Sequence, residues 1–160
     1  MRNLLMLIFI STAFATTLLI PSDEYPTIQA GIDAAEAGDT VLITSGTYSP
    51  ETGEIFPIIM ISNINLIGED EETTILDAQQ TGTVVTMDDC EINTISNLTI
   101  TGGMGENGGG MYLESSNPIL THVTISNNTA ETYGAGMRLS NSDPILTHVT
   151  ISNNTADYGG

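Results

Sequence analysis

Apolar and polar residues alternate along several short stretches in the second half of the chain. Met111 and Leu113 are two residues apart, as are Val123 and Ile125, and a Tyr or a Thr lies between the members of each pair. Alternation with a period of two is typical of a β-strand with one buried face. Leu120 and Val123 are three residues apart, so the phase of the alternation shifts between them. The pattern therefore predicts short strands joined by corners.

A near-identical repeat underlies this pattern. The sequence SNPILTHVTISNNTA at 116–130 recurs at 142–156, 26 residues later, with Asn117 replaced by Asp143 as the one change. A diverged copy at 95–100 precedes the matching residues by 25 positions, and an older one lies at 61–66. The match extends upstream of the main repeat, where Gly108, Gly110, Met111 and Leu113 correspond to Gly134, Gly136, Met137 and Leu139.

A unit of this size, with two or three short strands and Gly-rich turns, cannot bury its apolar face alone, whereas stacked copies can. Each coil would lie ~4.8 Å from the next, with identical positions in register. Leucine-rich repeats are disfavoured because their L-x-x-L-x-L pattern is missing, and a propeller blade needs about 40 residues. The predicted fold is all-β, a right-handed parallel β-helix solenoid with a short N-terminal capping helix. We expect Met111 to stack on Met137, Ile125 on Ile151 and Asn127 on Asn153.

The phase shift falls on Asn97, His122 and His148 in three successive copies. Asn and His tolerate a left-handed backbone better than most residues other than glycine, so we expect these three to form a corner. The two imidazoles would stack ~5 Å apart, a spacing at which they could share a metal ion. The presence of Asn97 at the same position favours a role in the turn.

Residues 16–48 are predicted to form an N-terminal cap with the first strand. Ile28, Ile32 and Ala35 share one face of a predicted helix over 27–36, and Thr27 is its expected N-cap. The first predicted strand is 40–43. The helix would cover the open apolar end of the first coil, and residues 49–160 would form the coils of the β-helix.

Residues 1–15 have the features of a secretory signal peptide. Arg2 supplies a positive start, Leu4–Ile10 an apolar core and Ala13-Phe14-Ala15 a small-residue cleavage site. Cleavage after Ala15 predicts a secreted or cell-surface protein with no membrane insertion afterwards. The alternative is an uncleaved anchor over 4–20, which has no charge, but Ser and Thr residues dilute this stretch and it is at the lower limit of length for a bilayer.

Acidic residues dominate the composition, with 20 Asp and Glu against two Lys and Arg. After cleavage, Arg138 would be the only strong base and the formal charge would be −19. Such a chain repels nucleic acid and anionic membrane surfaces, which are excluded as partners. The 40% of apolar residues, regularly spaced, nevertheless predict a folded chain. The single cysteine, Cys90, excludes an internal disulfide framework and is expected to be a buried apolar residue.

Two segments resemble known families. Residues 21–48 (PSDEYPTIQAGIDAAEAGDTVLITSGTY) resemble the opening of pectin-lyase-like β-helix proteins of bacterial secretion. Residues 108–130 (GGGMYLESSNPILTHVTISNNTA) resemble the repeats of polymorphic outer-membrane proteins. The resemblance implies the fold but no single reaction, because the superfamily includes lyases, hydrolases, esterases, epimerases and non-enzymatic surface proteins.

The catalytic motifs of these relatives are missing from this chain. It is similar to pectin methylesterases at 27–48 and 65–68, but their later QDTL- and DFIFG-like motifs are absent. Lyases of this fold use a Lys or Arg base, usually with calcium, and the one candidate, Arg138, aligns with the outward Tyr112, which favours a surface role. Glycosidases need aspartates a few ångströms apart. Asp88 and Asp89 would point to opposite faces of an extended strand and would converge only in a turn. A turn or coil edge without a catalytic role is therefore favoured.

The acidic stretch 69–72 (EDEE) could bind calcium through its carboxylates, but it lacks the D-x-D-x-D-G spacing, and a solvated loop is favoured. The glycosylation-like sequons that begin at Asn97, Asn127 and Asn153 are interpreted as residues of an asparagine ladder. We therefore predict no catalytic, cofactor-binding or metal-binding residue in this chain, and calcium is the one cofactor left open.

The chain stops in mid-coil at Gly159-Gly160, so we expect a fragment of a longer protein. The leading hypothesis is an exported cell-surface or extracellular β-helix with a non-catalytic binding or structural role, whose partners are extracellular glycans or cell-surface components. The competing hypothesis is the N-terminal part of a polysaccharide-active lyase, hydrolase or esterase whose catalytic residues lie beyond residue 160. The sequence does not predict an oligomeric state.

Overall fold

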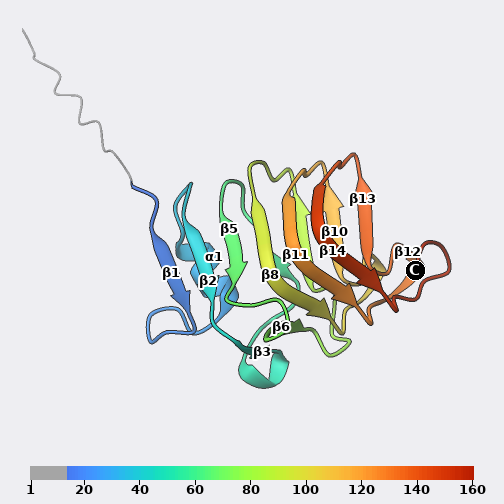
Figure 1. Ribbon diagram of the computed structural model, residues 1–160. Helices are drawn as coiled ribbons and strands as arrows, with labels where there is room; N and C mark the ends of the chain where they lie inside the picture. Colours follow the sequence, from blue (N-terminus) through green and yellow to red (C-terminus); the bar gives the residue numbers. More distant parts are fainter. Residues whose placement is uncertain (1–13) are drawn as a thin grey trace, which may run out of the picture.

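The structure, a computed structural model, describes residues 14–160, so most of the predicted signal peptide lies outside the described residues. The chain winds through successive coils of short strands (Figure 1), and every strand pairing within 14–160 is parallel. The predicted parallel β-solenoid is confirmed. Its elements are β1 (Thr17–Ile20), α1 (Ile28–Ala34), β2 (Thr40–Ile43), β3 (Gly46–Tyr48), the 3-10 helix η1 (Pro50–Thr52), β4 (Ile58–Ile59), β5 (Asn65–Gly68), β6 (Thr74–Asp77), β7 (Val85–Asp88), β8 (Thr94–Thr101), β9 (Met104–Asn107), β10 (Met111–Glu114), β11 (Ile119–Ser126), β12 (Thr129–Tyr133), β13 (Met137–Ser140) and β14 (Ile145–Ser152).

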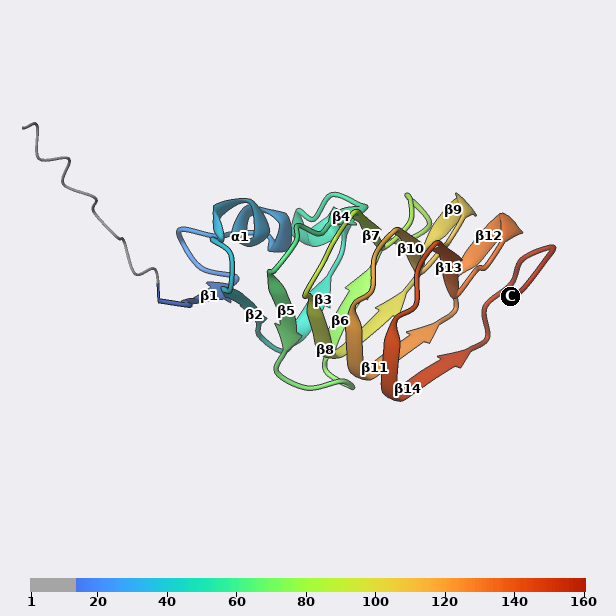
Figure 2. The same cartoon turned by 90° about the horizontal axis from the view of Figure 1, so that it is seen from above.

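Three parallel sheets form the walls of the solenoid. The largest has the order β1-β2-β5-β8-β11-β14, with β6 also pairing with β8 and with β3. A second sheet has the order β13-β10-β7-β4, and β9 pairs with β12 in the third. Neighbours within a sheet belong to successive coils, as the side-by-side strands in Figure 2 show. Each backbone ladder therefore joins one coil to the next.

The coils stack in the register that the repeat predicts. Met111 pairs with Met137, and Ile125 pairs with Ile151. On its other side, Ile125 pairs with Ile100 of the diverged copy. The spacing of the repeat thus sets which residues stack, because any slip by one residue would turn every apolar side chain outward.

The predicted corner residues adopt the left-handed backbone. The φ angles are 55° at Asn97 and 52° at both His122 and His148. Asn127 and Asn153 form a second column of corners, with φ of 56° and 55°. Each long strand, such as β11, bends at the first column and ends at the second, which closes the coil around its core.

An asparagine ladder satisfies backbone groups at this second column of corners. It is formed by Asn128 and Asn154, the residues that follow Asn127 and Asn153. The buried Asn128 accepts a hydrogen bond from the Gly103 N–H at 2.8 Å and donates to the carbonyl oxygens of Ile100 and Ser126 at 3.2 and 3.1 Å. Asn154 accepts from the Asn128 N–H at 2.9 Å. These bonds pair backbone groups of successive coils at a buried corner.

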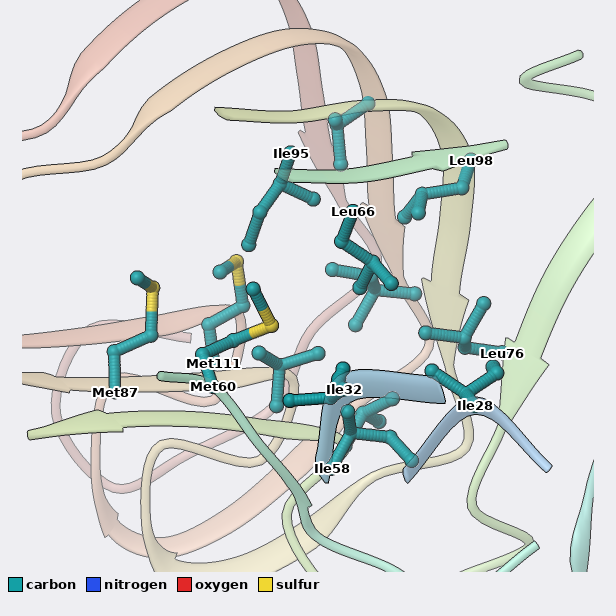
Figure 3. Close-up of a cluster of buried hydrophobic side chains, with 14 of the residues drawn as sticks. Ile28, Ile32, Ile58, Met60, Leu66, Leu76, Met87, Ile95, Leu98 and Met111 are labelled. Carbon is teal, nitrogen blue, oxygen red and sulfur yellow. The ribbon is translucent and has the colours of Figure 1, made fainter. Parts of the chain in front are cut away.

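Apolar side chains from successive coils fill the interior as one cluster, part of which is drawn in Figure 3. Leu66, Ile95 and Leu98 come from the large sheet, and Met87 and Met111 from the second sheet. All five are at most 1% exposed. At about 25 cal/mol per Å² of buried apolar surface, this cluster is the main stabilising term of a fold without disulfides.

The N-terminal helix forms where it was predicted, although it is shorter. Thr27 is the N-cap, and its hydroxyl accepts from the Ala30 N–H at 3.2 Å. Ile28 and Ile32, four residues apart, are fully buried on one face. Gly31 lies against the side chain of Ile20, where an added Cβ would come within 2.6 Å of the Cδ1 atom.

The prediction that 40–43 is the first strand was wrong. Thr17–Ile20 forms β1, which pairs with β2 and buries Leu18 and Ile20. These residues are also the end of the alternative anchor over 4–20, and here they belong to a sheet. The described part of the chain contains no helix that is long and apolar enough to cross a bilayer.

The helix covers the edge of the second sheet, whereas β1 ends the large sheet. The Gln29 carboxamide accepts from the Ile59 N–H at 2.8 Å and donates to the Ile59 carbonyl at 3.2 Å. It thereby replaces the strand that would otherwise pair with β4. An edge covered in this way offers no free ladder to another chain. Figure 2 shows α1 beside β1, β2 and β4.

At the other end of the stack, inward positions are exposed. Leu139, Leu146 and Ile151 are 40%, 47% and 45% exposed, although their partners Leu113, Leu120 and Ile125 are fully buried. The prediction that these apolar stacks are interior therefore holds for the inner coils and fails for the last described one, where nothing in residues 14–160 packs on the far side.

Glu54 is a carboxylate buried next to the helix. It is 4% exposed, and its Oε1 atom accepts from the Ile28 N–H at 2.9 Å, whereas Oε2 has no partner in the described residues. Burial raises the pKa of this carboxyl above its ordinary value, and the Ile28 hydrogen bond only partly offsets the rise. The charged form is therefore destabilised in the folded state.

Glu54→Gln should stabilise the folded state relative to the wild type, and this advantage should grow as the pH rises. Above the ordinary carboxyl pKa, the unfolded chain loses this proton first, so the wild type loses stability up to the raised folded pKa and then levels off. Urea unfolding of both proteins from pH 4 to 8 measures this. We expect the difference in unfolding free energy to grow in favour of E54Q and then to become constant; a pH-independent difference would contradict the assignment.

Candidate functional site

The residues singled out in the sequence for catalysis do not converge. Arg138 lies on the outer side of β13, in register with Tyr112 as predicted. Its guanidinium carbon is 5.3 Å from the ring centroid of Tyr133, and Nη1 donates to the Leu139 carbonyl at 3.3 Å. Asp88 is the last residue of β7, and Asp89, with a φ of 49°, follows the strand, so this pair lies at a coil edge, as predicted.

The acidic stretch 69–72 packs over the large sheet. The Glu69 carboxylate accepts from the Ser45 N–H at 2.8 Å, and the Glu71 carboxylate accepts from the Thr124 hydroxyl at 2.6 Å. Asp70 accepts from the Glu72 N–H at 3.0 Å. These carboxylates thus bond within the protein, and no group of three or more His, Cys, Asp or Glu in residues 14–160 is arranged to hold a metal ion. The prediction of no metal-binding residue stays a prediction, with calcium as the one cofactor left open.

Cys90 is buried as predicted, at 3% exposure. Its thiol donates to the Met60 carbonyl at 3.3 Å, and its backbone N–H donates to the Ser116 hydroxyl at 2.9 Å. Burial raises the pKa of the thiol, which keeps it protonated and unreactive. Cys90 thus fills part of the core and links its own coil to the coils before and after it.

A candidate for ligand binding is a groove along one edge of the solenoid, which we name the corner groove. It follows the corner where the chain enters β5, β8, β11 and β14, and it crosses successive coils. Its volume of about 460 Å³ lies in the range of small-molecule sites. The lining residues are Gly38, Asn63, Asn65, Ile92, Asn93, Thr94, Asn117, Ile119 and Ile145.

Carboxamides form the polar part of the corner groove. Asn65 accepts from the Thr94 N–H at 3.1 Å, and Asn117 accepts from the Asp143 N–H at 2.6 Å. Both bonds use the carboxamide oxygen, so the amide hydrogens remain as donors toward a ligand. Asn63 adds a third carboxamide. The groove therefore offers neutral hydrogen-bonding groups at intervals of one coil.

Asn93 has an unsatisfied buried oxygen. It is 2% exposed, and its amide donates to the carbonyls of Ile61 and Ile64, both at 2.7 Å. Its Oδ1 atom has no partner in the described residues. In the next coil the corresponding residue is Pro118, because Thr94 pairs with Ile119. Proline has no N–H to donate, so the stack cannot satisfy this oxygen.

Isoleucines form the apolar part of the corner groove. Ile119 and Ile145 are stacked partners that are 42% and 60% exposed. Ile92 is 76% exposed and has a φ of 59°. A left-handed backbone costs a β-branched residue about 1–2 kcal/mol, and such strain is concentrated at functional sites. None of the nine lining residues is ionisable, which favours an uncharged ligand with both apolar faces and hydroxyl groups.

Sequence reasoning did not find the corner groove. The repeated PIL segment, which includes Ile119 and Ile145, is the one sequence feature that could have indicated it. The isoleucine in each copy precedes an inward leucine and must therefore face outward. Ile92 and Asn93 lie in a turn that the repeat does not share, so no pattern marks them.

Comparison with known proteins gives a family and a fold. The protein-family profile described as "Protein of unknown function (DUF1565)" matches residues 21–159. Among solved structures, the chain is similar to the crystal structure of a pectin methylesterase mutant in complex with a hexasaccharide, with a TM-score of 0.62 and 16% sequence identity. The match covers 89% of this chain and 50% of that chain. No curated protein matches. At this identity the likeness shows the right-handed parallel β-helix fold alone.

Proposed function

The chain belongs to the DUF1565 family, and we propose that it is an exported, non-catalytic β-helix that binds uncharged glycan segments at the cell surface or outside the cell. The observation that carries this proposal is the corner groove, where carboxamide donors and exposed isoleucines lie together without an ionisable side chain. Hydroxyl groups of a sugar fit the carboxamides, and its apolar ring faces fit the isoleucines. The sugar bound by the pectin methylesterase structure is consistent with a glycan ligand on this fold.

Export is part of the proposal and rests on residues 1–15. A positive start, an apolar core and the Ala13–Ala15 site are the parts of a cleavable signal. The mature protein would begin at Thr16, directly before β1. Recovery of an intact, membrane-retained chain from the source cells would contradict this part.

The alternative is that this chain is the N-terminal part of a polysaccharide-active enzyme. It is favoured by the fold that the chain shares with pectin methylesterase, of which it spans about half the length. In that case the corner groove would be a substrate-binding surface and the reacting groups would lie in other coils.

Binding measurements test the corner groove, which both proposals use. Calorimetric titration with neutral xylo-, manno- and gluco-oligosaccharides should show binding that weakens at least tenfold in an Ile119→Ser/Ile145→Ser double variant. A matched control is Ile55→Ser, because Ile55 is 79% exposed and does not line the groove. Equal binding by the groove variant and the wild type would refute the site.

An activity assay separates the non-catalytic proposal from the enzyme alternative. The longest natural form of the protein should release neither methanol nor new reducing or unsaturated ends from neutral or uronate polysaccharides, with or without calcium. Turnover that a single substitution abolishes would overturn the non-catalytic proposal.

A further inference from the structure

The two histidines of the chain, His122 and His148, lie in direct contact on the outside of the large sheet. Their ring centroids are 4.7 Å apart and their planes differ by 16°. Both side chains are exposed. This pair is independent of the corner groove, since neither residue lines it.

The backbone fixes this pair firmly while leaving the rings accessible. Both histidines have a φ of 52°, and the strand residues on either side of them pair in register, Thr121 with Thr147 and Val123 with Val149. The two Cα atoms are therefore held one coil apart. Because the backbone positions are already fixed and only the rings have to turn, binding costs less conformational freedom than it would for two independent segments.

We propose that His122 and His148 together bind one divalent transition-metal ion such as zinc, nickel or copper. Imidazole nitrogens suit these ions, whereas calcium and magnesium prefer oxygen. In the observed stack the ring planes are nearly parallel, so binding requires the exposed rings to turn until one nitrogen of each lies ~2.0–2.1 Å from the ion. Water completes the coordination, because no third His, Cys, Asp or Glu within residues 14–160 is arranged to join.

Charge supports cation capture at this surface. The chain has a formal net charge of −18, which raises the local concentration of cations. The acidic stretch 69–72 lies over the same sheet, where Glu71 contacts Thr124 two residues beyond His122. Neighbouring carboxylates thus attract the ion, and the imidazoles select its type.

The preceding coil supplies matched variants. Asn97 occupies the same corner with a φ of 55°, so His122→Asn and His148→Asn should keep the backbone and remove the ligand. Asp143→Asn is the control for general attraction by the acidic surface, since Asp143 is exposed and outside the pair. Each untagged variant is first compared with the wild type by thermal unfolding in EDTA.

Titration with zinc or nickel should show one ion bound per chain, at least tenfold weaker in either histidine variant and unchanged in D143N. Calcium should not compete. In proton NMR, nickel should broaden the ring signals of both histidines together, an unambiguous observation because the chain has only two.

Metal binding that persists in the double histidine variant, or that calcium displaces equally well, would overturn the proposal, as would no uptake by the wild type at millimolar ion. If the Asn variants fail to fold, the wild-type nickel titration decides. Broadening of both imidazole signals supports the site, and broadening that leaves either of them unaffected contradicts it.

Discussion

Ile125→Asp should unfold the coil stack at room temperature. Ile125 is fully buried between Ile100 and Ile151, its partners in the two neighbouring coils. The substitution loses about 2–3 kcal/mol of apolar burial and places a carboxylate where no cation is near. An unpaired buried charge costs several kcal/mol more, and the total is comparable to the whole stability of a domain, about 5–15 kcal/mol. Far-UV circular dichroism and urea unfolding measure the loss.

Two matched controls separate the chemistry of the new side chain from the direction in which it points. Ile125→Val keeps the apolar contact and should cost about 0.5–1.5 kcal/mol. Thr150→Asp places the same charge on the exposed outer face of β14 and should change stability by no more than about 0.5 kcal/mol. Thr124 is a poorer control than its outward position suggests, because its hydroxyl donates to the Glu71 carboxylate. Equal loss in I125D and T150D would refute the inward and outward assignment.

Gly103→Ala should destabilise the fold by about 2–4 kcal/mol. A Cβ at Gly103 would overlap the carbonyl oxygen of Gly109, which is backbone and cannot turn away. Relief by a shift of the chain would break the bond from the Gly103 N–H to Asn128 and disturb the buried asparagine ladder. The backbone of Gly103 is not left-handed, so the effect is one of space alone. Chemical denaturation gives the size of the loss.

Gly82→Ala is the control for glycine replacement as such. Its added Cβ would meet the nearest atom, the Phe56 carbonyl oxygen, at 3.5 Å, an ordinary contact. The reduced freedom of the unfolded chain should then leave stability unchanged or raise it by up to about 1 kcal/mol. If G103A were as stable as G82A, the close approach of the coils at Gly103 would be wrong.

The sequence predicts the inner coils well because each copy constrains the next. Identical residues 26 positions apart can share one face only if they stack, so the pairs of Met111 with Met137 and of Ile125 with Ile151 follow from the spacing. The left-handed corner at His122 follows from the phase shift and from its replacement of Asn97. These inferences depend only on the repeat and on the phase of the apolar alternation within it.

The ends and the groove depend on long-range contacts that no repeat marks. β1 was missed because its four residues adjoin the apolar signal-like segment and have no copy. The role of Gln29 could not be predicted, because it depends on the position of Ile59, thirty residues away. The unsatisfied oxygen of Asn93 arises only when Pro118 comes to lie beside it. The corner groove therefore includes a residue at which neighbouring coils differ, Asn93, to which Pro118 corresponds in the next coil.

The most direct test of the account is whether neighbouring copies touch in solution. Val123 pairs with Val149 on one side and with Leu98 on the other. NMR of a sample with labelled Val and Leu methyl groups should show nuclear Overhauser effects from Val123 to both residues. A folded protein in which Val123 contacts neither Val149 nor Leu98 would contradict the stacked arrangement on which the groove and the histidine pair depend.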